Sequence, residues 1–282
     1  MKNLIILSDY GLDDAVALIY LLDNNKWDKI DIVAIAGNST AAKSLSNLQK
    51  LLANYWQVDE IDTKTDDEIK QEKKLKTTLM QKITIVDTTD KQQPFTELPS
   101  IHGDDGMGDL FINSISNCKC IKWNEWIAGV DKDGIFDIVS LGPATLVKDV
   151  INHLNDKDNS TLLMMGHCID AVPNLQGEEF NYKLDEETFE WCINNTRCII
   201  ATLDTCRDEY FNLANAKIKS NSPIFDTVIN KSIQLAVARH ADNAFIYDYI
   251  ACGYLINPNN FEVKVEKTRK GNHINHLKLK KS

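Results

Sequence analysis

Residues 4–23, with the sequence LIILSDYGLDDAVALIYLLD, decide the fold of this chain. The apolar run Leu4–Leu7 predicts a buried strand, and Asp13–Asp23 predicts the helix that follows it. Gly11 lies between the two, and glycine permits the tight turn that connects a strand to a helix. A strand followed at once by a helix is the repeating unit of α/β proteins.

The same alternation of apolar runs and amphipathic stretches continues along the chain. Further strands are predicted at Ile30–Ala36, Phe136–Leu141, Thr161–Met165 and Cys198–Leu203, with a helix at Thr40–Trp56. Strands that alternate with helices imply a mostly parallel, open sheet with helices on both faces. Because no internal repeat and no linker rich in Pro or Gly divides the chain, we expect residues 1–282 to form a single α/β domain.

Two charged segments depart from this pattern. Residues 59–82 have few apolar anchors, which predicts a solvated helix or a mobile excursion. The last fifteen residues contain four lysines, one arginine and two histidines. We therefore expect a solvated, partly frayed basic tail over residues 272–282, and not a binding patch.

The composition argues against several classes of protein. A formal net charge of −10 argues against a nucleic-acid partner, because phosphate binding favours a basic surface. No apolar run reaches the roughly 18 residues of a membrane helix, and the N-terminal run is too short for a signal peptide. We therefore expect a cytoplasmic protein with no membrane partner. Seven cysteines without paired CxxC spacing predict reduced thiols, with neither a zinc site nor a cysteine nucleophile.

Three carboxylates gather where the first predicted strand ends. Asp9 lies two residues past the strand, and Asp13 and Asp14 begin the helix. A helix dipole stabilises acidic residues in the first turn, which accounts for Asp13 and Asp14 but leaves Asp9 unexplained. A hard cation such as Ca²⁺ or Mg²⁺ accounts for all three, since it takes several oxygens from one loop. An aspartate that transfers a phosphoryl group is the rival hypothesis.

Five more polar stretches contain candidate ligand-binding groups, most of them just after a predicted strand, where α/β sheets bind ligands. They are AGNST at 36–40, IHGDDGMGD at 101–109, LGPATL at 141–146, NLQGEEFN at 174–181 and FIYDYIA at 245–251. Each has an ordinary alternative when taken alone, such as a helix cap, a glycine-rich loop or a strand-to-helix turn. Asp248, the only charged residue in its apolar stretch, needs a partner or a metal if it is buried.

Taken together and in this order, the six stretches resemble the inosine–uridine nucleoside hydrolase family. The opening resembles that family's Asp-Thr-Asp-Pro-Gly-x-Asp-Asp signature, IHGDDGMG its His-Gly-x-x-Gly-x-Gly loop, and LGPATL its Thr-Gly-Pro-Leu-Thr-Asn turn. EEFN resembles its Glu-Phe-Asn, YDYIA its His-Asp-Pro-x-Ala, and TRKG at 268–271 a Thr-Arg-Gly near its C-terminus. The resemblance runs from residue 4 to about residue 271 and implies the nucleoside hydrolase fold.

The resemblance implies an enzyme, a nucleoside N-ribohydrolase that uses Ca²⁺ to hydrolyse the N-glycosidic bond of ribonucleosides to ribose and free base. It implies that Asp9, Asp14, the carbonyl of Leu141 and Asp248 hold the metal, and that Asp9 is also the base that activates a water. It further implies substrate contacts from Asp13, Asn38, Asn174, Glu179, Asn181 and Asp248. Since the family is commonly dimeric or tetrameric, we expect a homodimer or homotetramer with a small nucleoside as substrate.

These residue types are consistent with that chemistry. Breaking an N-glycosidic bond builds positive charge on the ribose, as in the oxocarbenium-like transition state of O-glycosidases. A pocket rich in carboxylates stabilises this charge. A bound divalent cation lowers the pKa of its water, so that an aspartate can take the proton near neutral pH.

The chain departs from the family pattern at several positions. Leu7 replaces the first aspartate of the signature, Tyr10 its proline, and Leu146 the asparagine after the Gly-Pro turn. Tyr247 replaces the histidine that protonates the departing base in members that cleave inosine. A phenol with a pKa of ~10 is a poor acid for this step, so we expect purine nucleosides to be poor substrates.

Other side chains are candidates for the leaving group. His102 and His240 are candidate proton donors, with a structural hydrogen bond and a solvated position as the respective alternatives. Candidates for stacking on the base are Trp123, Trp126, Tyr247 and Tyr249, with burial in the core as the alternative. Two functions other than nucleoside hydrolysis stay open: a catalytically weak or inactive nucleoside-binding homologue, and a metal-dependent phosphohydrolase with Asp9 as nucleophile. The second lacks a phosphate cradle near Asp9.

Overall fold

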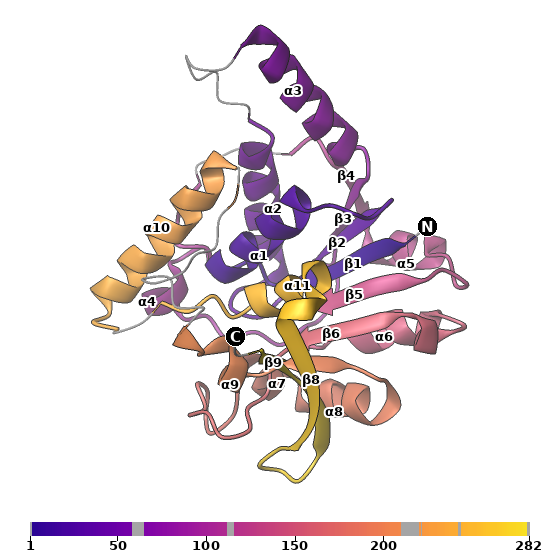
Figure 1. Cartoon of the computed structure of the whole chain (residues 1–282), viewed down its shortest axis with the longest axis vertical. Helices are drawn as coiled ribbons and strands as arrows, with labels where there is room; N and C mark the ends of the chain where they lie inside the picture. Colours follow the sequence, from indigo (N-terminus) through magenta and orange to yellow (C-terminus); the bar gives the residue numbers. More distant parts are fainter. Residues whose placement is uncertain are drawn as a thin grey trace.

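The computed structural model describes residues 2–57, 65–111, 116–209, 220, 222–241 and 244–280. Within these residues nine strands form one sheet in the order β4-β3-β2-β1-β5-β6-β7-β9-β8 (Figure 1). The strands are β1 (Asn3–Ser8), β2 (Ile30–Ala34), β3 (Ile83–Asp87), β4 (Lys119–Lys122), β5 (Phe136–Ser140), β6 (Thr161–Met165), β7 (Ile199–Ala201), β8 (Phe261–Lys267) and β9 (His273–Leu279). All neighbouring pairs are parallel except β8 and β9, so the predicted mostly parallel sheet is confirmed.

The strand order reverses at β1, and this reversal positions the functional site. After β1 the chain adds β2, β3 and β4 on one side, and it then places β5, β6 and β7 on the other. Ligands of open α/β sheets bind at such a switch point, outside the carboxyl ends of the strands. Asp9 follows β1 and Leu141 follows β5, so the fold brings both residues to the switch point.

Helices cover both faces of the sheet, as predicted. They are α1 (Leu12–Asp23), α2 (Ala41–Tyr55), α3 (Asp66–Met80), α4 (Pro99–His102), α5 (Trp123–Gly129), α6 (Val147–His153), α7 (Phe180–Leu184), α8 (Glu186–Asn195), α9 (Leu203–Cys206), α10 (Pro223–Ala238) and α11 (Tyr249–Ile256). Buried residues of α1, α2, α10 and α11 pack on one face, and those of α5, α6 and α8 pack on the other (Figure 1). Along β1 the side chains alternate between the two clusters, with Leu4 and Ile6 in the first and Ile5 and Leu7 in the second.

The expectation of a frayed basic tail over residues 272–282 is wrong for most of its length. His273–Leu279 forms β9, which lies between β7 and β8, and its residues Ile274, His276 and Leu277 are buried. Hydrogen bonding from a strand on each side, and not the composition of the segment, makes it part of the sheet. The sequence analysis also missed β3, β4 and β8.

The charged segment predicted at residues 59–82 contains α3, and its residues 59–64 lie outside the described part of the chain. None of the residues of α3 is buried, and the helix projects at one end of the molecule (Figure 1). The hydroxyl of Thr65 accepts a hydrogen bond from the backbone N–H of Glu68, whose side chain accepts one in return. Neither α3 nor any other helix in the described residues is long and apolar enough to cross a bilayer.

Candidate active site

A cavity of about 260 Å³ lies at the switch point between β1 and β5. Its lining brings together nearly all of the site residues predicted from the sequence. These are Asp9, Asp13, Asp14, Asn38, His102, Leu141, Asn174, Glu179, Asn181, Tyr247 and Asp248. His240 does not line the cavity; it is exposed, just beyond the end of α10.

The turn after β1 orients Asp14. The Ser8 hydroxyl donates a hydrogen bond to one carboxylate oxygen of Asp14, and the backbone N–H of Gly11 donates to the other at 2.8 Å. Tyr10 is fully buried in this turn and has a φ of 45°, in the left-handed region that is rare for a bulky residue. Such a conformation persists only where surrounding contacts hold it, so the turn is a rigid support for the acidic residues.

The segment after β2 holds Asp9. The backbone N–H of Asn38 donates to a carboxylate oxygen of Asp9 at 2.5 Å. This approach leaves no room for a side chain at Gly37, where a Cβ would lie 2.1 Å from Oδ2 of Asp9. The amide oxygen of Asn38 is buried and has no hydrogen-bond partner among the described residues. An unpaired buried acceptor is costly, which indicates that a ligand pairs with it.

Four carboxylates share the acidic end of the cavity. Asp13, Asp14 and Asp248 each offer an oxygen within 4.8 Å of the others, and Asp9 lines the same cavity. Burial, reinforced by the charge of Asp14, raises the pKa of Asp13 to about 7. Burial and neighbouring carboxylates also raise the pKa of Asp9 and of Asp248 well above the usual range. Ionised together, these groups are stable only if a cation lies among them.

The donor set fits a hard divalent cation such as Ca²⁺. Ca²⁺ binds oxygens at roughly 2.3–2.6 Å, so two of its ligands lie at most ~5 Å apart. The oxygens of Asp13, Asp14 and Asp248 meet this condition. The sequence analysis assigned Asp13 to the substrate, whereas the structure groups its carboxylate with the other two. The carbonyl of Leu141 lines the cavity too; it accepts a hydrogen bond from Asn181 at 2.6 Å and keeps a second lone pair.

Glu179 and Asn181 approach the cavity from the start of α7. The carboxylate of Glu179 caps this helix and accepts hydrogen bonds from the backbone N–H groups of His167 at 3.0 Å and Tyr182 at 2.9 Å. Burial raises the pKa of Glu179 to about 7. The side-chain amide of Asn181 also donates to the carbonyl of Met165 at the end of β6. Bonds to the backbone therefore hold both side chains in place, and His167 is a supporting residue that the sequence analysis missed.

His102, Arg239 and Tyr247 also line the cavity; because the resemblance implies contact with the leaving base at position 247, this part is named the leaving-group end. Burial and the positive charge of Arg239 lower the pKa of His102 to about 4, so its imidazole is neutral at pH 7. Burial raises the pKa of Tyr247, whose side chain hydrogen-bonds with that of Arg207. The sequence analysis missed Arg239, because no motif marks this arginine and the adjacent His240 is the better candidate by residue type.

Of the four aromatic candidates for base stacking, Tyr247 is the one that lines this cavity. Trp123 and Trp126 are buried on α5, within the core cluster on the other face of the sheet. The ring of Tyr249 packs on that of Tyr20, with 4.7 Å between centroids. Core packing therefore explains these three residues. Phe180 contributes a second aromatic ring to the lining.

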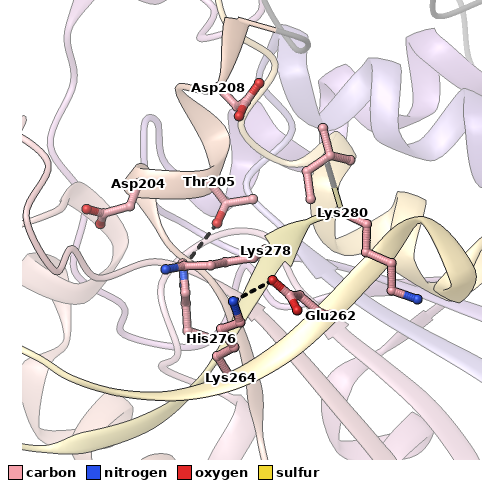
Figure 2. Close-up of a pocket in the computed structure, with 9 residues that line it drawn as sticks. Asp204, Thr205, Asp208, Glu262, Lys264, His276, Lys278 and Lys280 are labelled. Carbon is pink, nitrogen blue, oxygen red and sulfur yellow. Dashed lines mark hydrogen bonds and ion pairs between the residues drawn. The ribbon is translucent and has the colours of Figure 1, made fainter. Parts of the chain in front are cut away.

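A larger hollow, of about 700 Å³, lies beside β8 and β9 and has a different character (Figure 2). Both of its strand lysines that face a carboxylate are paired: Lys264 pairs with Glu262 at 2.6 Å, and Lys278 pairs with Glu266 at 2.5 Å. Burial lowers the pKa of His276, which lies beneath them. Such pairing is typical of a solvated surface groove, so the smaller cavity at the switch point is the candidate active site.

The sequence matches the model of the inosine-uridine preferring nucleoside hydrolase family over residues 4–279. The chain belongs to this family. The match covers nearly the whole chain and contains every residue that lines the cavity. It confirms the family prediction made from the six stretches and assigns the chain to the nucleoside N-ribohydrolases, which are glycosidases.

Solved nucleoside hydrolases share the fold of this family member at low sequence identity. A purine-preferring ribonucleoside hydrolase from Gardnerella vaginalis is 17% identical, with a TM-score of 0.67 over 97% of this chain and 88% of the other. An inosine-uridine preferring nucleoside hydrolase from Bacillus anthracis is 12% identical, with a TM-score of 0.63 over 99% and 94%. An inosine-guanosine nucleoside hydrolase is 16% identical, with a TM-score of 0.63 over 99% and 87%. A comparison with curated proteins gives no significant match.

Proposed function

We propose that this nucleoside hydrolase family member uses bound Ca²⁺ to hydrolyse the N-glycosidic bond of ribonucleosides, releasing ribose and the free base. One observation carries the proposal. The oxygens of Asp13, Asp14 and Asp248 lie within 4.8 Å of one another, in a cavity that also contains polar side chains suited to a sugar. The location of that cavity at the switch point of the sheet supports it further.

Asp14 and Asp248 would hold the cation, with Asp9, Asp13 and the carbonyl of Leu141 beside them, so that Asp13 would face both the cation and the ribose. A bound divalent cation supplies positive charge that lowers the pKa of a water and favours ionised carboxylates. Asp9 is the group that would take the proton of the attacking water. The N–H of Asn38 donates to one oxygen of Asp9, which orients the carboxylate and leaves its other oxygen for the water.

The remaining polar groups are suited to the ribose hydroxyls. They are Asp13, Asn38, Asn174, Glu179 and Asn181, all in the lining of the same cavity. As the glycosidic bond breaks, positive charge develops on the sugar, and the carboxylates around it stabilise that charge. Because backbone hydrogen bonds already fix Glu179 and Asn181, these side chains orient the sugar without rearranging.

A second function, nucleoside binding with weak or absent catalysis, is favoured by the leaving-group end of the cavity. Tyr247 stands where the resemblance implies a histidine, and His102 is neutral at pH 7 because its pKa is lowered to about 4. Neither group is a good proton donor to a departing base. General-acid catalysis typically raises the rate of a reaction by ~10²–10⁴-fold. An enzyme that lacks the acid is therefore expected to be slower by about this factor.

Turnover of nitrophenyl riboside tests the proposal, because nitrophenolate leaves without protonation. We expect hydrolysis that EDTA abolishes and Ca²⁺ restores, and a loss of at least ~10²-fold in kcat for Asp9→Asn, which removes the base. Asp67→Asn is the matched control and should retain full activity, since its side chain is 98% exposed on α3. Binding of Ca²⁺ and ribose without any turnover would support the binding protein. No Ca²⁺ binding by calorimetry would reject both functions.

A further inference from the structure

A second compartment of about 130 Å³ adjoins the cavity. The two compartments share five lining residues: Asp13, Ile101, His102, Arg239 and Tyr247. Apolar side chains form much of the rest of the second compartment, among them Leu12, Leu235, Ala236 and Phe245. With the sugar at the acidic end, a flat heterocyclic base that extends past Arg239 would enter this apolar space.

Arg239 supplies the permanent positive charge between the compartments. Among the described residues that line either compartment it is the single arginine, and none is a lysine. Nη1 of its guanidinium donates to the carbonyl of Ile101 at 2.9 Å, which ties the group to α4. A guanidinium carries five N–H donors in one plane, so further donors can face a ligand.

His102 and Tyr247, which line both compartments with Arg239, are poor proton donors at neutral pH. The pKa of His102 is lowered to about 4 by burial and by the charge of Arg239, so its imidazole carries no extra proton to donate. The phenol of Tyr247 is a weak acid, since a phenol has an ordinary pKa of ~10. Arginine itself stays protonated in proteins. Of these three side chains, Arg239 can therefore stabilise negative charge, and none readily supplies a proton to the base.

We propose that Arg239 binds a carbonyl oxygen of the departing base and stabilises the negative charge that the base acquires as the glycosidic bond breaks. The favoured substrates are ribonucleosides whose base leaves as an anion spread over carbonyl oxygens, as uracil does. Cytosine has an amino group in place of one carbonyl, so it spreads the charge less well and depends more on protonation. This assignment rests on the function proposed above and adds the class of base to it.

The electrons and protons of the step balance without a further reactant. The bonding pair of the C1′–N bond passes to the base and is delocalised onto the carbonyl oxygen beside Arg239. The oxygen of a water bonds to C1′ of the ribose, and one proton of that water passes to Asp9. The released base takes a proton from solvent and Asp9 returns its proton to solvent, so one water is consumed in total.

Arg239→Gln tests the assignment with uridine, cytidine and nitrophenyl riboside. Loss of one preorganised donor to developing negative charge typically costs ~10²–10³ in rate, so kcat/KM for uridine should fall about 10²-fold. Nitrophenolate is already a stable anion, so kcat/KM for nitrophenyl riboside should change less than about threefold. The ratio of kcat/KM for uridine to kcat/KM for cytidine should fall at least about tenfold.

Arg239→Lys keeps the charge and should retain part of the uridine activity. His240→Gln is the matched control, because His240 is exposed outside the cavity.

Two kinetic outcomes would overturn the assignment. Unchanged uridine kinetics in Arg239→Gln means that the side chain does not act on the base. An equal loss for uridine and nitrophenyl riboside means that Arg239 has a structural role through its contact with Ile101.

If the wild-type chain turns over no riboside, the function proposed above fails, and calorimetry then tests Arg239 separately. Uridine should bind to Arg239→Gln about tenfold more weakly than to wild type, whereas cytidine should bind to both equally. Equal uridine affinities of the two proteins would overturn the assignment.

Discussion

The acidic end and the leaving-group end of the cavity are supported differently. At the acidic end, Asp9 follows β1, and Asp14 and Asn181 lie in the first turns of α1 and α7; each is buried and makes a hydrogen bond with a backbone group. At the leaving-group end, Tyr247 precedes α11, and the exposed Arg239 follows α10. Buried groups that are bonded to the backbone are held more rigidly than exposed or half-buried groups in connecting segments. The difference indicates that the acidic end is the more rigid of the two; in the proposed function it holds the sugar, while the residues around α10 and α11 select the base.

The largest effect is expected at the acidic end, from Asp14→Asn. The substitution removes one negative charge and one oxygen ligand from the group formed with Asp13 and Asp248. Because a catalytic metal contributes several kcal/mol, kcat/KM for nitrophenyl riboside should fall by about 10³ or more, together with Ca²⁺ affinity. Steady-state kinetics and calorimetry measure the two effects. Undiminished Ca²⁺ binding by the variant would show that Asp14 is not a metal ligand, and Asp67→Asn should match wild type in both assays.

The next largest effect is expected at the leaving-group end, from Tyr247→His. An imidazole can donate a proton near neutral pH, where the phenol of Tyr247 cannot. We expect kcat/KM for inosine to rise by about 10²-fold, while that for nitrophenyl riboside stays nearly constant. A ratio of the two values that does not change would mean that position 247 does not face the base.

Glu179→Gln probes the pH dependence that burial imposes on the acidic end. The pKa of Glu179 rises from an ordinary 4.5 to about 7 on folding, so the folded state favours its protonated form. Its contribution to stability is therefore fully present below pH ~4.5 and is lost as the pH rises through ~7. Glutamine does not ionise. Without added Ca²⁺, the variant should gain about 2–3 kcal/mol in free energy of unfolding over wild type between about pH 5 and pH 8. Urea denaturation at several pH values measures this gain, and parallel stability curves would contradict it.

The smallest effect is expected from Gly37→Ala, which crowds Asp9 without removing a charge. A Cβ at this position would lie 2.1 Å from Oδ2 of Asp9, so the segment after β2 must shift. Overpacking of this kind costs about 1–3 kcal/mol, which thermal denaturation can detect, and activity should fall because Asp9 moves. Gly129→Ala is the matched control, since a Cβ there meets nothing within 4 Å. Equal effects of the two substitutions would mean that the approach to Asp9 is not tight.

Most of the acidic end could be predicted from the sequence because its residues belong to short local motifs. The strand, the turn at Gly11 and the carboxylates of Asp9 and Asp14 lie within one stretch, so their relative positions follow from the chain itself. Glu179 and Asn181 are likewise two residues apart, at the start of one helix. The central strands could be predicted for a similar reason, since strands buried on both faces are continuous apolar runs.

The sequence by itself thus determined the local turns that carry carboxylates, whereas the tertiary structure decided which distant segments meet. His273–Leu279 has the composition of a solvated tail, and it is a strand because β7 and β8 pair with it on either side. Arg239 carries no motif, and it reaches the cavity because α10 packs against both α1 and α4. His240, the next residue, has a φ of 55° beyond the end of the helix, and its side chain is exposed. Strand pairing and helix packing bring together segments that are far apart in the chain. Neither the composition of a segment nor its local spacing predicts such contacts.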